Sequence, residues 1–236
     1  MEQAREWLRA ATSVAALTGA GISAESGIPT FRGVGGLWRQ FRPEELATPE
    51  AFARDPRLVW EWYDWRRGLI AAAKPNAGHR ALAELERSKP HFTLITQNVD
   101  GLDERAGCRN VLKLHGDIWV MRCTGCGRER RDETPSLAEL PPRCECGCLL
   151  RPGVVWFGEA LPGDLWREAE EAARSAGVFL VIGTSAVVYP AAGLIWLARS
   201  SGAKVIEINP EETPLTGQLD RALRGAAGEL LPQLIA

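Results

Sequence analysis

The sequence predicts an α/β protein with a Rossmann-like parallel sheet, helices on both faces of that sheet, and a small inserted zinc-ribbon and helical module. Three observations support this fold class. Short apolar runs that suit buried strands alternate with helical patterns along much of the chain. Small or polar residues follow the apolar runs, as at the ligand-binding edge of an open parallel sheet. Five of the six cysteines gather between Cys123 and Cys148.

The composition is that of an ordinary globular chain and excludes several classes of protein. Of 236 residues, 45% are apolar and 25% are charged, and the net charge of −2 gives no global footprint for nucleic acid. The N-terminal segment lacks the long apolar run of a signal peptide, and no stretch approaches the ~20 apolar residues of a membrane helix. We therefore expect a cytoplasmic protein with reduced thiols and with neither nucleic acid nor membrane as a partner.

The first elements resemble the start of a mononucleotide-binding unit. Residues 2–12 have apolar positions at helical spacing, and the apolar run 14–18 suits a buried strand. That strand leads directly into Gly19-Ala20-Gly21, where small residues let the backbone approach a phosphate. The third glycine of the G-x-G-x-x-G pattern is replaced by Ala24, so this signal alone is weak.

The remaining elements continue the alternation, with two interruptions. Helical patterns extend from about 43 to 88, with Asn76 as a plausible N-cap, and four further strands are predicted at 91–96, 111–114, 179–182 and 204–208. Segments 36–88 and 120–151 do not fit the alternation, so we interpret them as a helical and a cysteine-rich insertion. The Rossmann-like domain then consists of residues 1–35, 89–119 and 152–236.

The cysteine spacing predicts a zinc ribbon. Cys123 and Cys126 form a C-x₂-C pair, and Cys144, Cys146 and Cys148 follow at intervals of two. The preferred ligands are Cys123, Cys126, Cys144 and Cys146, although Cys148 could replace either of the last two. A redox pair or inert thiols is the other interpretation. A closed site of four thiolates leaves no open coordination position, so this zinc would be structural.

Polar side chains follow the predicted strands at the edge where a ligand would bind. Gln97, Asn98 and Asp100 follow one strand and His115 follows the next, while Arg32 in the first loop could neutralise a phosphate. The reference pKa of histidine, ~6.5, suits a general base near neutral pH. His115 is therefore the candidate base, and the histidines at 79 and 91 are interpreted as structural.

The order of the motifs along the chain resembles that of the sirtuins, the NAD-dependent protein-lysine deacylases. Each motif alone is moderately specific, but the set in this order is highly specific. The motifs are Gly19–Gly33, Thr96–Leu102, Leu114–Gly116, the cysteine pairs, Leu150–Glu159, Gly183–Ser185 and Ile208–Pro210.

The resemblance implies roles for individual residues. NAD would be the co-substrate, beside one structural zinc ion, and His115 and Asn98 would be catalytic, with His115 as the base. Acyl-lysine proteins or peptides would be the partners, with Val155, Trp156 and Phe157 pairing with the peptide backbone as an added strand. The products would be free lysine, nicotinamide and O-acyl-ADP-ribose. The cofactor-binding residues would be Gly19, Ala20, Gly21, Phe31, Arg32, Gln97, Asn98, Asp100, Gly183, Thr184, Ser185, Asn209 and Ala227.

A tyrosine and an arginine in the helical insertion indicate which acyl group is removed. Tyr63 and Arg66 are three positions apart, so they share one face of a helix. A phenol and a guanidinium together can bind a carboxylate. The pair resembles the sirtuin subgroup that accepts acidic acyl groups such as succinyl and malonyl. The alternative is a solvated helix face covered by aromatic packing.

The sequence is also compatible with two other functions. One is protein ADP-ribosylation, and the other is a non-catalytic, NAD-sensing binding module. Binding alone requires neither His115 nor Asn98, and the Tyr63–Arg66 pair favours deacylation over transfer of ADP-ribose.

Overall fold

The computed structural model describes residues 1–32, 36, 37 and 42–236. Within them, six parallel strands form the main sheet in the order β3-β2-β1-β7-β8-β9. Their bounds are β1 Ser13–Thr18, β2 His91–Thr96, β3 Val111–Lys113, β7 Val178–Ile182, β8 Lys204–Asn209 and β9 Arg221–Arg224. The predicted parallel sheet is therefore confirmed. β9 was not predicted, and the predicted strand 111–114 ends one residue earlier.

The strand order identifies where a ligand binds. Counted within this sheet alone, the order is 3-2-1-4-5-6, which is that of the Rossmann fold. β1 and β7 are parallel neighbours, but β2 and β3 lie on one side of β1, whereas β8 and β9 lie on the far side of β7. The connections that leave the carboxyl ends of β1 and β7 therefore run in opposite directions across the sheet. In open α/β sheets the crevice at such a switch point is the usual binding site.

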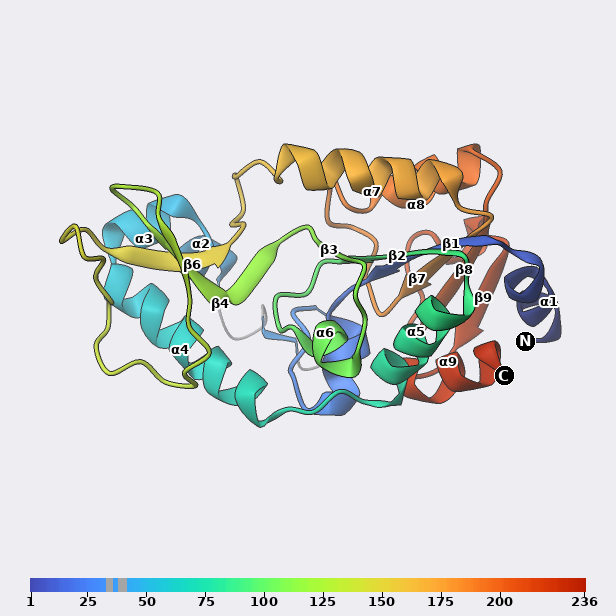
Figure 1. The fold of residues 1–236 in the computed structure, drawn as a ribbon, viewed down its shortest axis with the longest axis horizontal. Helices are drawn as coiled ribbons and strands as arrows, with labels where there is room; N and C mark the ends of the chain where they lie inside the picture. The colour runs from blue at the N-terminus through green and yellow to red at the C-terminus, as the bar shows by residue number, and fades with distance from the viewer. Residues whose placement is uncertain (33–35, 38–41) are drawn as a thin grey trace.

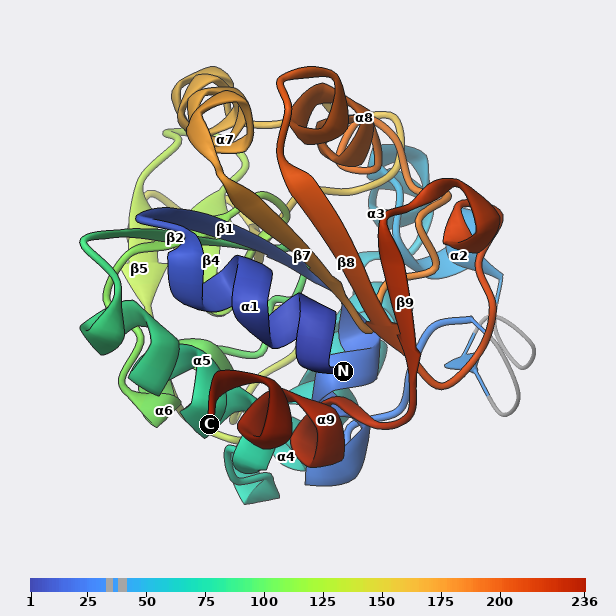
Figure 2. The same ribbon diagram turned by 90° about the vertical axis from the view of Figure 1, so that its right-hand side faces the viewer.

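Helices cover both faces of the sheet, as expected. In Figure 2, α1 (Glu2–Ala10), α5 (Ala77–Ser88) and α9 (Ala227–Ile235) lie on one face, and α7 (Gly163–Ser175) and α8 (Gly193–Ser200) lie on the other. Side chains alternate between the two cores: Val14 and Ala16 face the first group of helices, whereas Ala15 and Leu17 face the second.

The two predicted insertions pack together into one small lobe. Helices α2 (Pro43–Leu46), α3 (Pro49–Arg54) and α4 (Pro56–Ala72) lie against an antiparallel sheet of order β5-β4-β6, at the left of Figure 1. Its strands are β4 Gly116–Cys123, β5 Glu129–Arg131 and β6 Leu150–Val154. The Trp60 indole donates to the Leu150 carbonyl at 2.7 Å, and a separate apolar core fills the lobe. β4 and β6 extend beyond the predicted insertion 120–151, and the predicted division into domains stays a prediction.

Local sequence signals explain where the helices begin. The side chains of Thr48 and Asp55 accept hydrogen bonds from the first turns of α3 and α4, and proline occupies the first turn of each helix. Asn76 accepts bonds from the amides of Gly78 and His79, which confirms its predicted role as an N-cap. The first helix ends at Ala10 instead of residue 12.

Some helices were not predicted from the sequence, and some predicted segments lie outside the described residues. The loop after β1 contains a 3₁₀ helix, Ala20–Ser26, and two short helices, α6 (Leu102–Ala106) and Thr216–Gln218, were not predicted. Gly33 of the first motif and residues 38–41 of the helical insertion lie outside the described residues. Among the described helices, none has both the length and the apolar character that a membrane span requires.

Candidate active site

A cavity of about 850 Å³ separates the main sheet from the small lobe. This volume falls within the ~300–1,000 Å³ typical of small-molecule sites. The predicted site residues that line it are Gly19, Ala20, Gly21, Phe31, Arg32, Tyr63, Arg66, Gln97, Asn98, Asp100, His115, Val155, Trp156, Phe157, Gly183, Thr184, Ser185 and Asn209. Ala227 does not line it; this residue is buried at the start of α9.

Glycines let two strand ends meet at the floor of this cavity. The Gly21 amide donates to the Gly183 carbonyl at 2.8 Å, and a Cβ at Gly21 would lie 2.7 Å from the Gly183 Cα. Gly183 has a φ of +58°, and a Cβ there would lie 2.4 Å from the Ile22 nitrogen. No side chain fits on either strand end, so the floor is main chain, which is what a pyrophosphate seat requires.

Amide side chains tie the ends of neighbouring strands together around this floor. The Asn98 side chain donates to the Gly19 carbonyl at 3.1 Å, and the Gln97 side chain donates to the Thr184 hydroxyl at 3.0 Å. Asn209, at the end of β8, donates to the Thr184 carbonyl at 2.9 Å. The cavity edge is therefore held in one arrangement before a ligand enters, which favours dinucleotide binding.

His115 has the environment of a neutral base. Its Nδ1 lies 3.0 Å from the Gln97 carbonyl oxygen, which can only accept, so Nδ1 carries the proton and Nε2 keeps its lone pair. Burial lowers the pKa of His115, while the bond to the Gln97 carbonyl opposes that shift. The imidazole is therefore uncharged at neutral pH, as a general base must be.

A buried polar chain behind the cavity was not expected from the sequence. The Ser23 hydroxyl donates to Asp100 Oδ2 at 2.8 Å and lies 3.4 Å from His79 Nε2. Burial raises the pKa of Asp100 and lowers that of His79 to about 4. Ser23 itself lines the cavity and belongs to the first motif, which was the available signal, whereas His79 on α5 reaches the chain only through the tertiary fold.

The cavity end inside the small lobe contains a buried guanidinium. Arg66 is 7% exposed, and its guanidinium carbon lies 4.9 Å, 4.8 Å and 5.6 Å from the ring centroids of Phe31, Trp62 and Tyr63. Within the described part of the chain, Arg66 has neither an ion pair nor a hydrogen bond. Burial lowers its pKa, but an arginine stays charged in proteins.

Four cysteines lie in the arrangement of a metal site. The sulfurs of Cys123, Cys126, Cys144 and Cys146 all lie within 4.8 Å of one another, with distances of 3.5 Å and 3.8 Å for two of the pairs. Tetrahedral ligands at ~2.3 Å from zinc are ~3.8 Å apart, so the four thiols fit this ion. Amide hydrogen bonds from Cys126 and Gly125 lower the pKa of Cys123 to about 6, which favours the thiolate that zinc binds.

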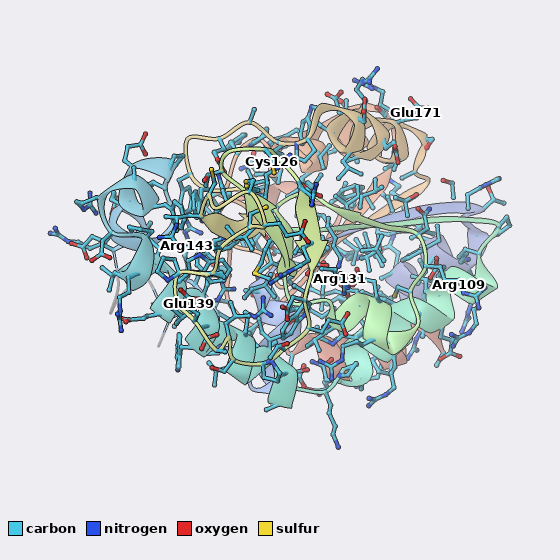
Figure 3. The ribbon with its side chains drawn as sticks, turned by 60° about the vertical axis from the view of Figure 1, so that its left-hand side comes forward. Arg109, Cys126, Arg131, Glu139, Arg143 and Glu171 are labelled. Carbon is cyan, nitrogen blue, oxygen red and sulfur yellow. The ribbon has the colours of Figure 1, made fainter. Side chains whose placement is uncertain are left out.

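The fifth thiol of the module lies apart from this group. A Cβ at Gly125 would be 2.4 Å from Cys148 Sγ, so Cys148 packs beside the Gly125 backbone. Figure 3 shows Cys126 on the surface of the small lobe, well separated from Arg109 beside β3 of the main sheet. Among the described residues, the four cysteines of the metal site are not part of the cavity lining, in keeping with a structural role.

Fold and cavity together define a dinucleotide-dependent enzyme with an inserted zinc module. Similarity to known proteins identifies its family. The Sir2 family model matches residues 19–190. An NAD-dependent protein deacylase of Aquifex aeolicus (strain VF5) is 64% identical over 205 residues, covering 86% of each chain. NAD-dependent protein deacylase 1 of Archaeoglobus fulgidus is 56% identical over 221 residues, covering 93% of this chain and 90% of that protein. The chain belongs to the Sir2 family, the sirtuins.

Solved structures agree with this assignment. A Sir2 homologue in complex with NAD has a TM-score of 0.94 at 52% identity, covering 100% of this chain and 92% of that one. A Sir2 complex with a deacetylated p53 peptide and 3′-O-acetyl-ADP-ribose has a TM-score of 0.91 at 32% identity, covering 100% and 97%. Family membership confirms the enzyme class predicted from the motifs, an NAD-dependent protein deacylase, and its use of NAD.

Proposed function

We propose that this deacylase removes succinyl and malonyl groups, as well as acetyl groups, from lysine side chains of proteins. The observation that supports the acidic preference is Arg66, a buried guanidinium that faces the cavity and has no carboxylate partner among the described residues. An unpaired buried charge costs several kcal/mol. A substrate that brings a carboxylate into the cavity offsets this cost, whereas an acetyl group does not.

Tyr63 completes the proposed carboxylate site. Its side chain is 3% exposed, lines the same cavity and lies one helical turn before Arg66 on α4. A guanidinium can supply paired donors to a carboxylate, and a phenol can supply one more. Aromatic rings surround the guanidinium, and such rings interact favourably with a cation while leaving its N–H groups available in the plane.

The chain's own residues then have assigned tasks in the reaction. NAD, when bound, would supply the ribose carbon that accepts the acyl oxygen as nicotinamide leaves. Gly19, Ala20, Gly21 and Arg32 hold the diphosphate, and Gln97, Asn98 and Asp100 place the nicotinamide end. His115 takes a proton from a ribose hydroxyl through its free Nε2. With one water molecule consumed, the expected products are free lysine, nicotinamide and the O-acyl-ADP-ribose.

Phe31, Gly183, Thr184, Ser185, Asn209 and Ala227 complete the proposed cofactor contacts. Phe31, Ser185 and Asn209 all line the cavity, and Ser185 and Asn209 are proposed to contact the adenosine half of NAD. Ala227 begins α9 next to the backbone of Gly78, so its proposed place beside the adenine depends on how far the dinucleotide extends along that edge.

The acyl-lysine peptide is proposed to pair with residues 155–157. The amides of Val155 and Phe157 already donate to the carbonyls of His115 and Ala47 at 2.9 Å and 3.0 Å, and the Trp156 amide donates to Glu159. An added strand would therefore bond to carbonyl oxygens of this segment. The relative solved with a deacetylated peptide supports a peptide substrate for this chain.

An Arg66→Met substitution tests the acyl preference. We expect kcat/KM for a succinyl-lysine peptide to fall at least ~10-fold, or about 1.4 kcal/mol, because the carboxylate loses its charged partner. For the acetyl-lysine form of the same peptide, kcat/KM should be unchanged. Arg57→Met is a matched control, since Arg57 lies on the same helix but is exposed and paired with Glu61. An equal loss on both acyl groups would refute the proposal.

Product analysis separates this function from the alternatives. Incubation of the protein with NAD and a succinyl-lysine peptide should give free peptide and O-succinyl-ADP-ribose by mass spectrometry. A peptide that gains the mass of ADP-ribose would indicate a protein ADP-ribosyltransferase instead. An unchanged peptide with intact NAD would indicate a binding module.

A further inference from the structure

Trp156 connects the proposed carboxylate site to the peptide-binding segment. Its side chain is 3% exposed, and its indole Nε1 donates to the Tyr63 hydroxyl at 3.0 Å. The ring lies against Phe52, with centroids 5.4 Å apart. A residue from the segment that follows β6 therefore reaches across to a side chain of α4.

Charged neighbours fix the position of this indole. The Arg151 guanidinium lies 3.5 Å from the Trp156 ring centroid and makes a two-pronged ion pair with Glu159, at 2.5 Å and 2.9 Å. Glu159 also accepts the Trp156 amide at 2.8 Å. The Arg151–Glu159 ion pair thus holds both the ring and the main chain of Trp156. The indole N–H is therefore fixed in its direction toward Tyr63.

This direction determines what the Tyr63 hydroxyl can do. An indole nitrogen donates and never accepts, so the Tyr63 oxygen is the acceptor in this bond and the hydroxyl proton must point elsewhere. Within the described part of the chain, the hydroxyl has no second hydrogen-bond partner. Burial raises the pKa of Tyr63, so the phenol keeps its proton at neutral pH.

We propose that Trp156 is a positioning residue that makes Tyr63 a hydrogen-bond donor to the acyl carboxylate, and so contributes to selection of acidic acyl groups. The proposal rests on the proposed function, because it requires that the carboxylate lies between Tyr63 and Arg66. Without the indole N–H, the phenol could turn its proton toward another acceptor or act as an acceptor itself. A negative acyl group then loses one aligned donor, whereas a neutral acyl group does not.

The test compares two acyl groups of equal size. One peptide has succinyl-lysine, and the other has the corresponding terminal amide, which lacks the negative charge. For Trp156→Phe we expect the ratio of the two kcat/KM values to fall by about 5–10-fold toward the neutral substrate. Any effect of the substitution on peptide binding is shared by both substrates and cancels in the ratio.

A double-mutant cycle shows whether the effect acts through Tyr63. Tyr63→Phe should lower the same ratio, and adding Trp156→Phe should then lower it no further, because the two residues act through one hydrogen bond. Additive losses, or an unchanged ratio in Trp156→Phe, would overturn the proposal.

A spectroscopic measurement keeps the proposal testable if Trp156→Phe folds poorly. The indole ¹H–¹⁵N resonance of Trp156, one of nine tryptophans, should shift upfield in Tyr63→Phe, because the acceptor is lost. A resonance that does not move would overturn the proposed bond.

The Arg66→Met variant distinguishes the proposed carboxylate site from the proposed positioning role of Trp156. A retained succinyl preference in that variant would reject the carboxylate site and the positioning role together. A lost preference there, with an unchanged ratio in Trp156→Phe, would reject the positioning role alone.

Discussion

Asp103 is a buried carboxyl group whose protonation depends on the fold. It is 2% exposed, and its Oδ1 has no hydrogen-bond partner among the described residues. Burial raises its pKa to about 8, and the nearby negative charge of Asp100 adds to the shift. The folded pKa lies above the unfolded value of ~3.9, so this group's contribution to stability is full below pH ~3.9 and is lost as the pH rises toward 8.

An Asp103→Asn substitution should therefore stabilise the protein increasingly as the pH rises. Asparagine keeps the shape of the side chain and cannot ionise. The gain in free energy of unfolding over the unsubstituted protein should grow by on the order of 3 kcal/mol between pH 5 and pH 8, measured by urea unfolding. Asp164→Asn, on the exposed start of α7, is the control for the loss of a carboxylate that is not buried. A constant gain for Asp103→Asn would contradict the shifted pKa.

Individual site residues were predictable where the chemistry lies in one motif, and not where it depends on packing. The motifs placed His115, Asn98 and the glycines on the cavity. The spacing from Tyr63 and the family resemblance selected Arg66, but the sequence did not predict the environment of its neighbour Arg67, which is the opposite of that of Arg66. Arg67 is fully buried and donates to the carbonyls of Ile118, Asp132 and Thr134, whereas Arg66 faces the cavity.

At the scale of the elements, strands were predictable where both faces are buried. β1 and β7 are continuous apolar runs because helices cover them on both sides. β9 was missed because it is an edge strand with arginine at both ends and only Leu223 buried. The small sheet was missed because Pro152 and Gly153 interrupt β6 and the pairing of β4 with β6 shifts register after Gly116.

The zinc module provides a test that distinguishes ligands from a neighbouring thiol. Cys146→Ser should reduce bound zinc from about one ion per chain to nearly none, because a fourth thiolate is lost. Cys148→Ser should keep the ion, since the Cys148 sulfur lies beside Gly125 and outside the four-sulfur group. Zinc content of the purified variants, measured by inductively coupled plasma mass spectrometry, gives the result. Zinc retained by Cys146→Ser and lost by Cys148→Ser would assign the fourth ligand to Cys148.

At the scale of the whole molecule, separate cores fill the main sheet and the small lobe. The clusters on the two faces of the main sheet share no residue with the cluster of the lobe. The lobe core includes Cys123 and Leu150 and has Cys144 packed against it, so two of the four proposed zinc ligands connect the metal site to this core. Loss of zinc should therefore affect one lobe first.

Chelation should loosen the small lobe and leave the main sheet protected. By hydrogen–deuterium exchange, we expect faster exchange in β4, β5 and β6 after zinc removal, and unchanged protection in β1 and β7. Turnover should also fall, because residues 155–157 directly follow β6 on the cavity wall. Cooperative loss of protection in both sheets would contradict independent lobes, and full turnover after complete removal would contradict a structural role for the metal.

The Gly21–Gly183 contact has a consequence for how such a scaffold can diversify. Where the dinucleotide is proposed to rest, the wall consists of peptide units, whose shape changes little when neighbouring side chains are exchanged. At the opposite end of the cavity, the proposed recognition of the acyl group depends on the tips of two side chains on one helical turn. Exchanges on that turn can therefore give a new acyl preference, while the machinery that consumes NAD stays as it is.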